Sequence, residues 1–224
     1  MKVMSNPIRP NLKTELVPIL FVLVSIILSF YFFVHFPERV ATHWGINGEA
    51  NGWSSRSFAA FFFPALNLAI YLLMFFVPIL DPKKANYEHF RTAYHAIKGA
   101  LVIFLSLIYL VVGMNGLGYG APVSLVVPVG IGALFVIIGY YLDCVKQNWF
   151  LGIRTPWTLS SELVWQKTHH FGSRVFIIGG VLLALAAFFP QALWIFLIVI
   201  FMMLAATILY SYLIYRLERK SLTK

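Results

Sequence analysis

Charged residues are scarce in this sequence: Asp, Glu, Lys and Arg make up 11% of its 224 residues, whereas 60% of the residues are hydrophobic. An ordinary soluble domain contains roughly 25% charged and about 45–50% apolar residues. A soluble core has no room for this much additional apolar surface. The composition therefore excludes an ordinary soluble globular protein.

The charges that are present leave long stretches of the chain free of them. Four uncharged runs of 19, 24, 44 and 41 residues cover 16–34, 57–80, 99–142 and 175–215. Because a helix needs about 20 apolar residues to cross a bilayer, each shorter run holds one span and each longer run holds two. We therefore predict an all-α, polytopic membrane protein with six transmembrane helices. The predicted spans lie near residues 16–35, 58–80, 96–113, 122–142, 174–190 and 192–215.

Basic residues fall almost entirely on one side of the predicted membrane. The six-span scheme places 15 of the 17 Lys and Arg residues on the side of the two termini, and only Arg39 and Arg56 on the other. Such an excess marks the cytoplasmic side of membrane proteins, so we predict that both termini are cytoplasmic. This bias also accounts for the net charge of +9 without direct binding of nucleic acid. The lipid bilayer is the expected partner of the basic face.

Further absences limit the chemistry. The single cysteine, Cys144, excludes an internal disulfide, and we interpret it as a packing residue. The interiors of the predicted spans hold no ionisable residue, which argues against a pump or an ion-coupled transporter. His43 and Glu49 are two potential metal ligands without a third, so we predict no metal site and no cofactor.

The predicted spans leave no room for a separate soluble domain. We expect a single membrane domain over residues 1–224. Its amino-terminal part, residues 1–95, carries an outer loop at 36–57, and its second part, residues 96–224, carries an inner loop at 143–173. A cleaved signal peptide is the alternative for the first span. The apolar run of 19 residues exceeds the roughly 7–15 of a signal-peptide core, so we expect that span to remain attached.

Small and polar residues inside the spans predict how the helices pack. Gly and Ala let helix backbones approach closely in lipid, and a buried amide favours a hydrogen bond to a neighbouring helix. We expect such a bond from Asn67. The small residues of the fourth and fifth spans are Gly130, Gly132, Gly139, Gly179, Gly180 and Ala184.

The outer loop has the composition of a structured cap. It contains two Asn-Gly pairs, which favour tight turns because both residue types tolerate positive φ. Its tryptophans are suited to the membrane interface. A loop hydrogen-bonded at head-group level, with no ligand, is the alternative. The candidate binding residues of this loop are His43, Trp44, Asn47, Glu49 and Trp53.

The inner loop predicts a short amphipathic helix. Pro156 biases Thr155 to an extended conformation, and Thr158 or Ser160 then caps a helix that ends near Gly172. On that helix three side chains, spaced three and four residues apart, share one face with Arg154 nearby, and this face is the candidate binding surface. These side chains are Glu162, Trp165 and His169.

Two other interpretations of the inner loop stay open. In the first, the helix lies flat at the interface, anchored by Trp149, Trp157 and Trp165, while Arg154 pairs with Glu162 or a lipid phosphate. In the second, Glu162 and His169 are the acid and base of a membrane enzyme, although no nucleophile or metal triad accompanies them.

The inner loop also resembles a known signature. The segment from Gly152 to Leu159, followed by Trp165, resembles the motif of the SdpI family of bacterial membrane proteins. The outer loop resembles the amino-terminal domain commonly joined to that family. The outer-loop residues that carry this second resemblance are Pro37, His43, Trp44, Gly48 and Ser55.

The resemblance implies a non-enzymatic, multi-pass protein of the bacterial cytoplasmic (inner) membrane. It further implies immunity to a secreted, membrane-active peptide toxin and relay of the toxin's presence to a cytoplasmic repressor. A small-molecule or lipid transporter and a membrane-embedded enzyme at the cytoplasmic face are the alternatives. The candidate inner-loop residues are Asn148, Gly152, Arg154, Thr155, Pro156, Trp157, Thr158, Glu162, Trp165 and His169.

Overall fold

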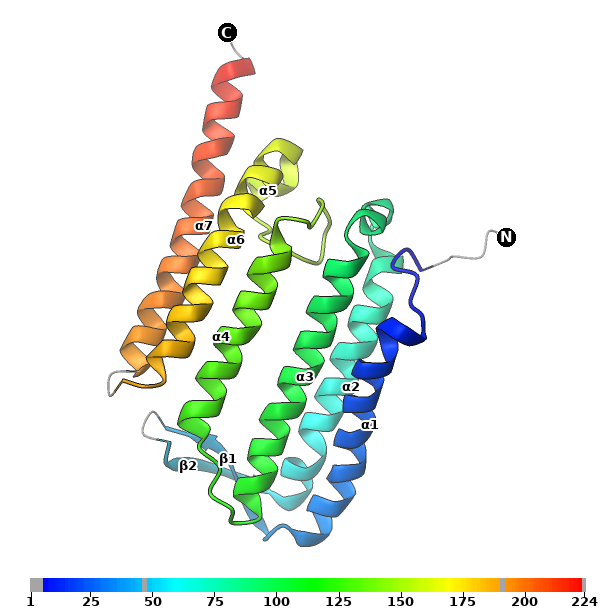
Figure 1. The fold of residues 1–224 in the computed structure, drawn as a ribbon, viewed down its shortest axis with the longest axis vertical. Helices are drawn as coiled ribbons and strands as arrows, with labels where there is room; N and C mark the ends of the chain where they lie inside the picture. Colours follow the sequence, from blue (N-terminus) through cyan, green and yellow to red (C-terminus); the bar gives the residue numbers. More distant parts are fainter. Residues whose placement is uncertain (1–5, 46–47, 190–191, 223–224) are drawn as a thin grey trace.

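The computed structural model describes residues 6–45, 48–189 and 192–222 and contains six helices long and apolar enough to cross a membrane (Figure 1). The predicted all-α class with six candidate spans is confirmed. These helices are α1 (Leu12–His35), α2 (Arg56–Leu80), α3 (Arg91–Gly116), α4 (Val123–Leu142), α6 (Glu162–Ala186) and α7 (Ala192–Leu222).

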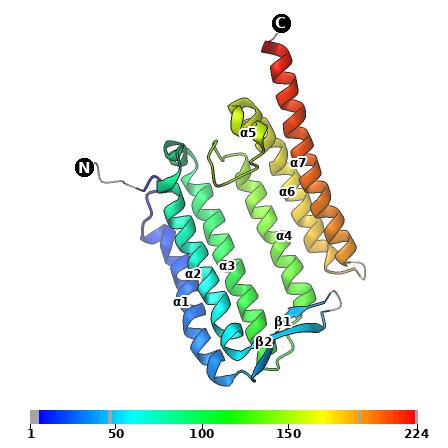
Figure 2. The ribbon, with the colours of Figure 1, turned by 180° about the vertical axis from the view of Figure 1, so that it is seen from behind.

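The helices form two groups that stand side by side. Helices α1, α2 and α3 pack on one another, α6 packs between α4 and α7, and α3 meets α4 where the groups join (Figures 1 and 2). The two ends of the described chain and the loops at 81–90 and 143–161 lie at one end of the bundle, which we call the terminal end. The opposite end carries a β-hairpin and is called the hairpin end.

The hairpin is the structured cap expected from the outer loop. Strands β1 (Arg39–Trp44) and β2 (Ala50–Ser55) pair antiparallel, and Gly48 between them has a φ of +76°. Asn47 lies outside the described residues. The second expected turn is wrong, because Gly52 lies within β2 and pairs with His43 at an irregular point in the register.

The inner loop differs from its prediction. A short 3-10 helix, η1 (Lys84–His89), and helix α5 (Pro156–Ser160) lie at the terminal end, and α6 then runs without interruption from Glu162 through Gly172. The separate amphipathic helix that ends at Gly172 is therefore wrong, as is a fifth span that begins at residue 174. A Cβ on Gly172 would lie 2.4 Å from Ile153 Cδ1, so this glycine permits close packing inside a helix rather than ending one.

Close packing at small residues is confirmed between α4 and α6. A Cβ on Gly132 would lie 2.5 Å from the Gly180 carbonyl oxygen, and one on Gly180 would lie 2.6 Å from the Gly132 oxygen. A Cβ on Gly139 would likewise lie 2.8 Å from the Ile177 backbone nitrogen. Backbones this close gain van der Waals contact along the helix pair.

Polar residues inside the first helix group give one confirmation and one correction. Asn67 on α2 donates to Ser106 Oγ on α3 at 2.9 Å, as expected. The prediction that the spans hold no ionisable residue is wrong, because Glu15 and Lys98 are buried inside α1 and α3. Lys98 already lies within the predicted third span, near 96–113, whereas Glu15 lies in α1 because this helix begins at Leu12, before the uncharged run at 16–34.

Candidate functional site

The inner loop is built around one buried amide at the terminal end. Asn148 is fully buried, and its Nδ2 donates to the carbonyls of Lys146 at 2.9 Å and Leu151 at 2.8 Å. Its Oδ1 accepts from the backbone N–H groups of Phe150 at 2.9 Å and Leu151 at 2.6 Å. The Asn148 side chain therefore supplies the hydrogen bonds that backbone groups would otherwise make with one another, and it fixes the path of the loop.

Three residues of the motif interlock beside it. Gly152 has a φ of +116°, and a Cβ there would lie 2.3 Å from His169 Nε2. That nitrogen accepts the Ile153 N–H at 3.1 Å, so the ring proton is on Nδ1, which donates to the Trp165 carbonyl at 2.9 Å. The Trp165 ring stacks on His169 with centroids 4.0 Å apart, and its Nε1–H donates to the Val145 carbonyl at 2.8 Å. His169 is thus a neutral, fully bonded brace of the loop.

The Thr-Pro-Trp-Thr part of the motif is a helix start. Thr155 Oγ1 accepts the Thr158 N–H at 3.2 Å, and Thr158 Oγ1 accepts the Thr155 N–H at 2.9 Å, which is a reciprocal capping box. Pro156 occupies the first turn of α5, where its missing N–H has no consequence. Thr155 Oγ1 also lies 3.1 Å from Ser211 Oγ on α7. The cap thereby fastens the loop to the last helix.

A second loop, at 81–90, is joined to the motif through Asp81. This carboxylate is buried and accepts the Tyr87 hydroxyl at 2.8 Å and the Trp149 N–H at 2.9 Å. Burial, together with the adjacent carboxylate, raises the pKa of Tyr87 far above its ordinary value, so the phenol remains a hydrogen-bond donor. Sequence reasoning missed both residues. The available signal was an isolated acid directly after the second span.

The expected face of Glu162, Trp165 and His169 does not form a shared surface. Trp165 and His169 are buried, whereas Glu162 is exposed on the first turn of α6. An acid–base pair of Glu162 and His169 is therefore not brought together. The flat interfacial helix is also wrong, since these residues begin a candidate span.

The residues of the motif that remain accessible are few. Arg154 is exposed and donates to the Trp149 carbonyl at 2.5 Å rather than pairing with Glu162. Trp157 is half-buried against the Tyr212 ring of α7, with centroids 5.1 Å apart. Pro156 is also exposed, and Arg154, Trp157 and Glu162 are the accessible candidate residues that we call the inner surface.

At the hairpin end, His43 is engaged within the sheet. Its Nδ1 lies 2.5 Å from Asn51 Oδ1 on the opposite strand. Glu49 and Trp53 are exposed, with Trp53 showing 50% of its surface. No group of three or more His, Cys, Asp or Glu residues suited to a metal ion occurs in the described part of the chain.

A small cavity of about 210 Å³ lies beneath the hairpin. Three consecutive residues of β1, Thr42 to Trp44, contribute its polar lining. A mostly apolar lining with a few polar groups suits an apolar side chain or tail. The wall residues, from α2, α3 and α4, are Phe63, Ile108, Val111, Val112, Val123 and Val127.

These features define a multi-pass membrane protein with a capped cavity at one end and a braced loop at the other. Residues 145–212 match the model of the SdpI/YfhL protein family, and residues 20–68 match a domain of unknown function, DUF1648. The first match contains the inner motif and the second contains the hairpin. The resemblance to the SdpI family and to its amino-terminal companion domain is thereby confirmed.

A curated relative supports the same assignment. The chain is 28% identical over 197 residues to the protein named Immunity protein SdpI of Bacillus subtilis (strain 168). That alignment covers 88% of this chain and 92% of the relative. No solved structure matches the chain.

Proposed function

We propose that this chain protects a bacterium from a secreted, membrane-active peptide and relays the presence of that peptide to a cytoplasmic repressor. The observation that carries the proposal is the near full-length similarity to a protein named as an immunity protein. Both distinctive regions, the hairpin and the braced loop, fall inside the family matches.

The distribution of charge supports an orientation for this activity. Arg39 and Arg56 belong to the hairpin end, whereas Lys83, Lys146 and Arg154 belong to loops of the terminal end. From the positive-inside bias we propose that the terminal end faces the cytoplasm of the bacterial inner membrane and the hairpin faces outward. A peptide that arrives from outside would meet the hairpin first.

The cavity beneath the hairpin supports the recognition step. A membrane-active peptide presents bulky apolar side chains, and the volume of about 210 Å³ suits a single such side chain. The exposed Trp53 and Glu49 offer apolar and charged contacts beside it. On the cytoplasmic side, the inner surface of Arg154, Trp157 and Glu162 is the proposed contact for the repressor.

The direct test is expression of the chain in Bacillus subtilis cells that lack their own Immunity protein SdpI and are exposed to the corresponding toxin. We expect survival to rise well above that of cells carrying the empty vector. The experiment is repeated with secreted peptides from related bacteria. Unchanged survival across that panel, with the chain detected in the membrane, would overturn the proposal.

A transporter is the second candidate, because one observation now favours it. Buried ionisable residues inside membrane helices often mark substrate or ion pathways, and Glu15 and Lys98 are such residues. Reconstituted vesicles loaded with a pH-sensitive dye test this alternative. Flux above that of protein-free vesicles would support transport, and its absence would remove the reason for considering it.

A further inference from the structure

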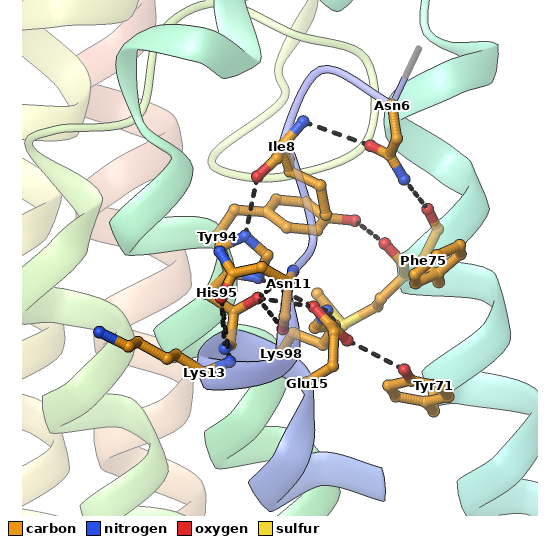
Figure 3. Close-up of polar contacts among 12 residues, drawn as sticks. Asn6, Ile8, Asn11, Lys13, Glu15, Tyr71, Phe75, Tyr94, His95 and Lys98 are labelled. Atoms are coloured by element: carbon orange, nitrogen blue, oxygen red, sulfur yellow. Dashed lines mark hydrogen bonds and ion pairs between the residues drawn. The ribbon is translucent and has the colours of Figure 1, made fainter. Parts of the chain in front are cut away.

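Residues 6–10, which we call the strap, lie across the terminal end of the first helix group (Figure 3). The strap is anchored by Ile8, whose side chain is 1% exposed. Ile8 belongs to a buried cluster that also contains Tyr87, Phe90, Tyr94 and the motif residue Trp165. One apolar side chain of the strap therefore contributes to the same core that supports the inner loop.

Polar contacts hold the strap to α2, α3 and η1. Arg9 Nη2 lies 3.5 Å from Glu88 Oε1 on η1, and three further hydrogen bonds end on backbone carbonyls. They are the bonds from Asn6 Nδ2 to the Phe75 oxygen at 2.9 Å, from Arg91 Nε to the Pro7 oxygen at 3.0 Å, and from His95 Nε2 to the Ile8 oxygen at 2.9 Å.

His95 lies between the strap and a buried ion pair: its Nε2 bonds the Ile8 carbonyl, and its Nδ1 approaches Glu15 without forming a hydrogen bond. Lys98 Nζ lies 2.7 Å from both carboxylate oxygens of Glu15, and Tyr71 donates to the same carboxylate at 2.9 Å. His95 Nδ1 lies 3.3 Å from Glu15 Oε1, while the opposite ring nitrogen holds the Ile8 carbonyl. Lys98 is fully buried and Glu15 is 6% exposed. We call Glu15, Lys98 and His95 the latch.

The strap has the features of a segment that can leave its site. Arg9 has a φ of +47°, a conformation in which a non-glycine residue is strained. Helix α1 does not depend on the strap for its own start, because Asn11 and Thr14 close it with a capping box. Release of residues 6–10 therefore leaves α1 intact.

We propose that the strap is a releasable element that couples α1 to the inner surface. When the latch is closed, Ile8 completes the cluster around Trp165 and the loop at 143–155 is held. Release removes Ile8 from that cluster and loosens the loop. Helix α1 carries the latch residue Glu15 in its first turn, and after Phe36 the chain leads directly into the hairpin. A tilt of α1 at the hairpin end would therefore move Glu15 relative to Lys98.

This inference rests on the proposed function, since it names how the inner surface is regulated by events at the hairpin. A buried ion pair suits such an element. Its closed form is satisfied, while loss of one partner leaves an uncompensated charge and strongly disfavours the closed state.

Thiol reactivity in lipid nanodiscs tests the strap. The only native cysteine, the exposed Cys144, is replaced by Ser, and Ile8→Cys or the exposed control Lys13→Cys is introduced. A polar maleimide should modify Ile8→Cys about 100-fold more slowly than Lys13→Cys, because only opened molecules react. Adding Lys98→Met should raise the Ile8→Cys rate about tenfold or more, whereas the exposed control Lys84→Met should not change it.

The rate of trypsin cleavage after Lys146 and Arg154 measures whether release of the strap also loosens the inner loop. Lys98→Met should speed this cleavage several-fold, and Lys84→Met should not. Equal thiol rates for Ile8→Cys and Lys13→Cys would overturn the strap. Faster thiol modification without faster cleavage would overturn the coupling. If Lys98→Met does not fold, Glu15→Gln is used instead, because it leaves the Lys98 charge uncompensated, and full protection of Ile8→Cys in that variant would overturn the latch.

The two proposals fail separately. These rates are measured without any toxin, so a chain that gives no immunity can still show a latched strap. Conversely, the chain could protect cells while the latch variants show unchanged thiol and cleavage rates. That result would support the immunity proposal and overturn the strap proposal.

Discussion

Gly152 lies so close to His169 that a single methyl group at the glycine would come 2.3 Å from the imidazole Nε2. The same nitrogen accepts the Ile153 N–H, so the glycine and the histidine together set the geometry of the inner loop. Some residues of the sequence motif therefore pack inside the inner loop, while others are accessible on its surface.

We predict that Gly152→Ala destabilises the protein more than an ordinary positive-φ substitution does. Gly118 also has a positive φ, of +86°, but a Cβ on this glycine would have no atom within 4 Å. Gly118→Ala should cost about 1 kcal/mol from backbone strain alone, and Gly152→Ala about 3 kcal/mol or more from strain plus the clash. Thermal unfolding in detergent compares the two. Equal midpoints would show that His169 moves aside freely.

Filling the cavity beneath the hairpin should reduce protection without unfolding the protein. Val112 lines the cavity, whereas Leu110 on the same helix faces outward with 41% of its surface exposed. Val112→Phe is expected to lower survival about tenfold, which corresponds to roughly 1.4 kcal/mol of lost binding, while Leu110→Phe has no effect. Cell survival at matched membrane levels is the measurement. Full protection by Val112→Phe would remove the cavity from the recognition step.

Substitutions on the inner surface should separate relay from protection. Arg154→Ala and Trp157→Ala remove accessible side chains and leave the buried brace of Asn148 and His169 in place. We expect both to reduce repressor recruitment, by about tenfold if each removes a contact worth roughly 1.4 kcal/mol. The exposed Lys146→Ala, on the same loop, is the control. Co-sedimentation of the repressor with membranes reports the outcome, and unchanged recruitment in both variants would place the contact elsewhere.

A larger residue at the α4–α6 contact should prevent the second helix group from packing. Gly132→Leu would push against the Gly180 carbonyl, a backbone atom that cannot rotate away. The neighbouring Ala133 is exposed, so Ala133→Leu should be tolerated. We expect the monodisperse peak in size-exclusion chromatography to be lost for Gly132→Leu and kept for Ala133→Leu. A normal peak for Gly132→Leu would show that these helices adapt.

Much of the fold could be predicted because lipid imposes simple rules on a chain. The uncharged runs indicated six spans, and the small residues of the fourth and fifth spans indicated close helix packing, although not which helices meet. The fifth span was misplaced because residues 162–174 are polar in sequence but continue the same helix. Their polar side chains lie at its terminal end, where the adjoining loop packs against them.

The amino-acid sequence by itself determined that this is a six-span membrane protein with a basic face and two distinctive loops, since hydropathy and charge are local properties. Only the tertiary structure decided what the loop residues do. Trp165 and His169 turned inward, and Glu15 met Lys98 from a helix 83 positions away. Partner choice across such a distance depends on how helices are placed in space, and no local pattern encodes it.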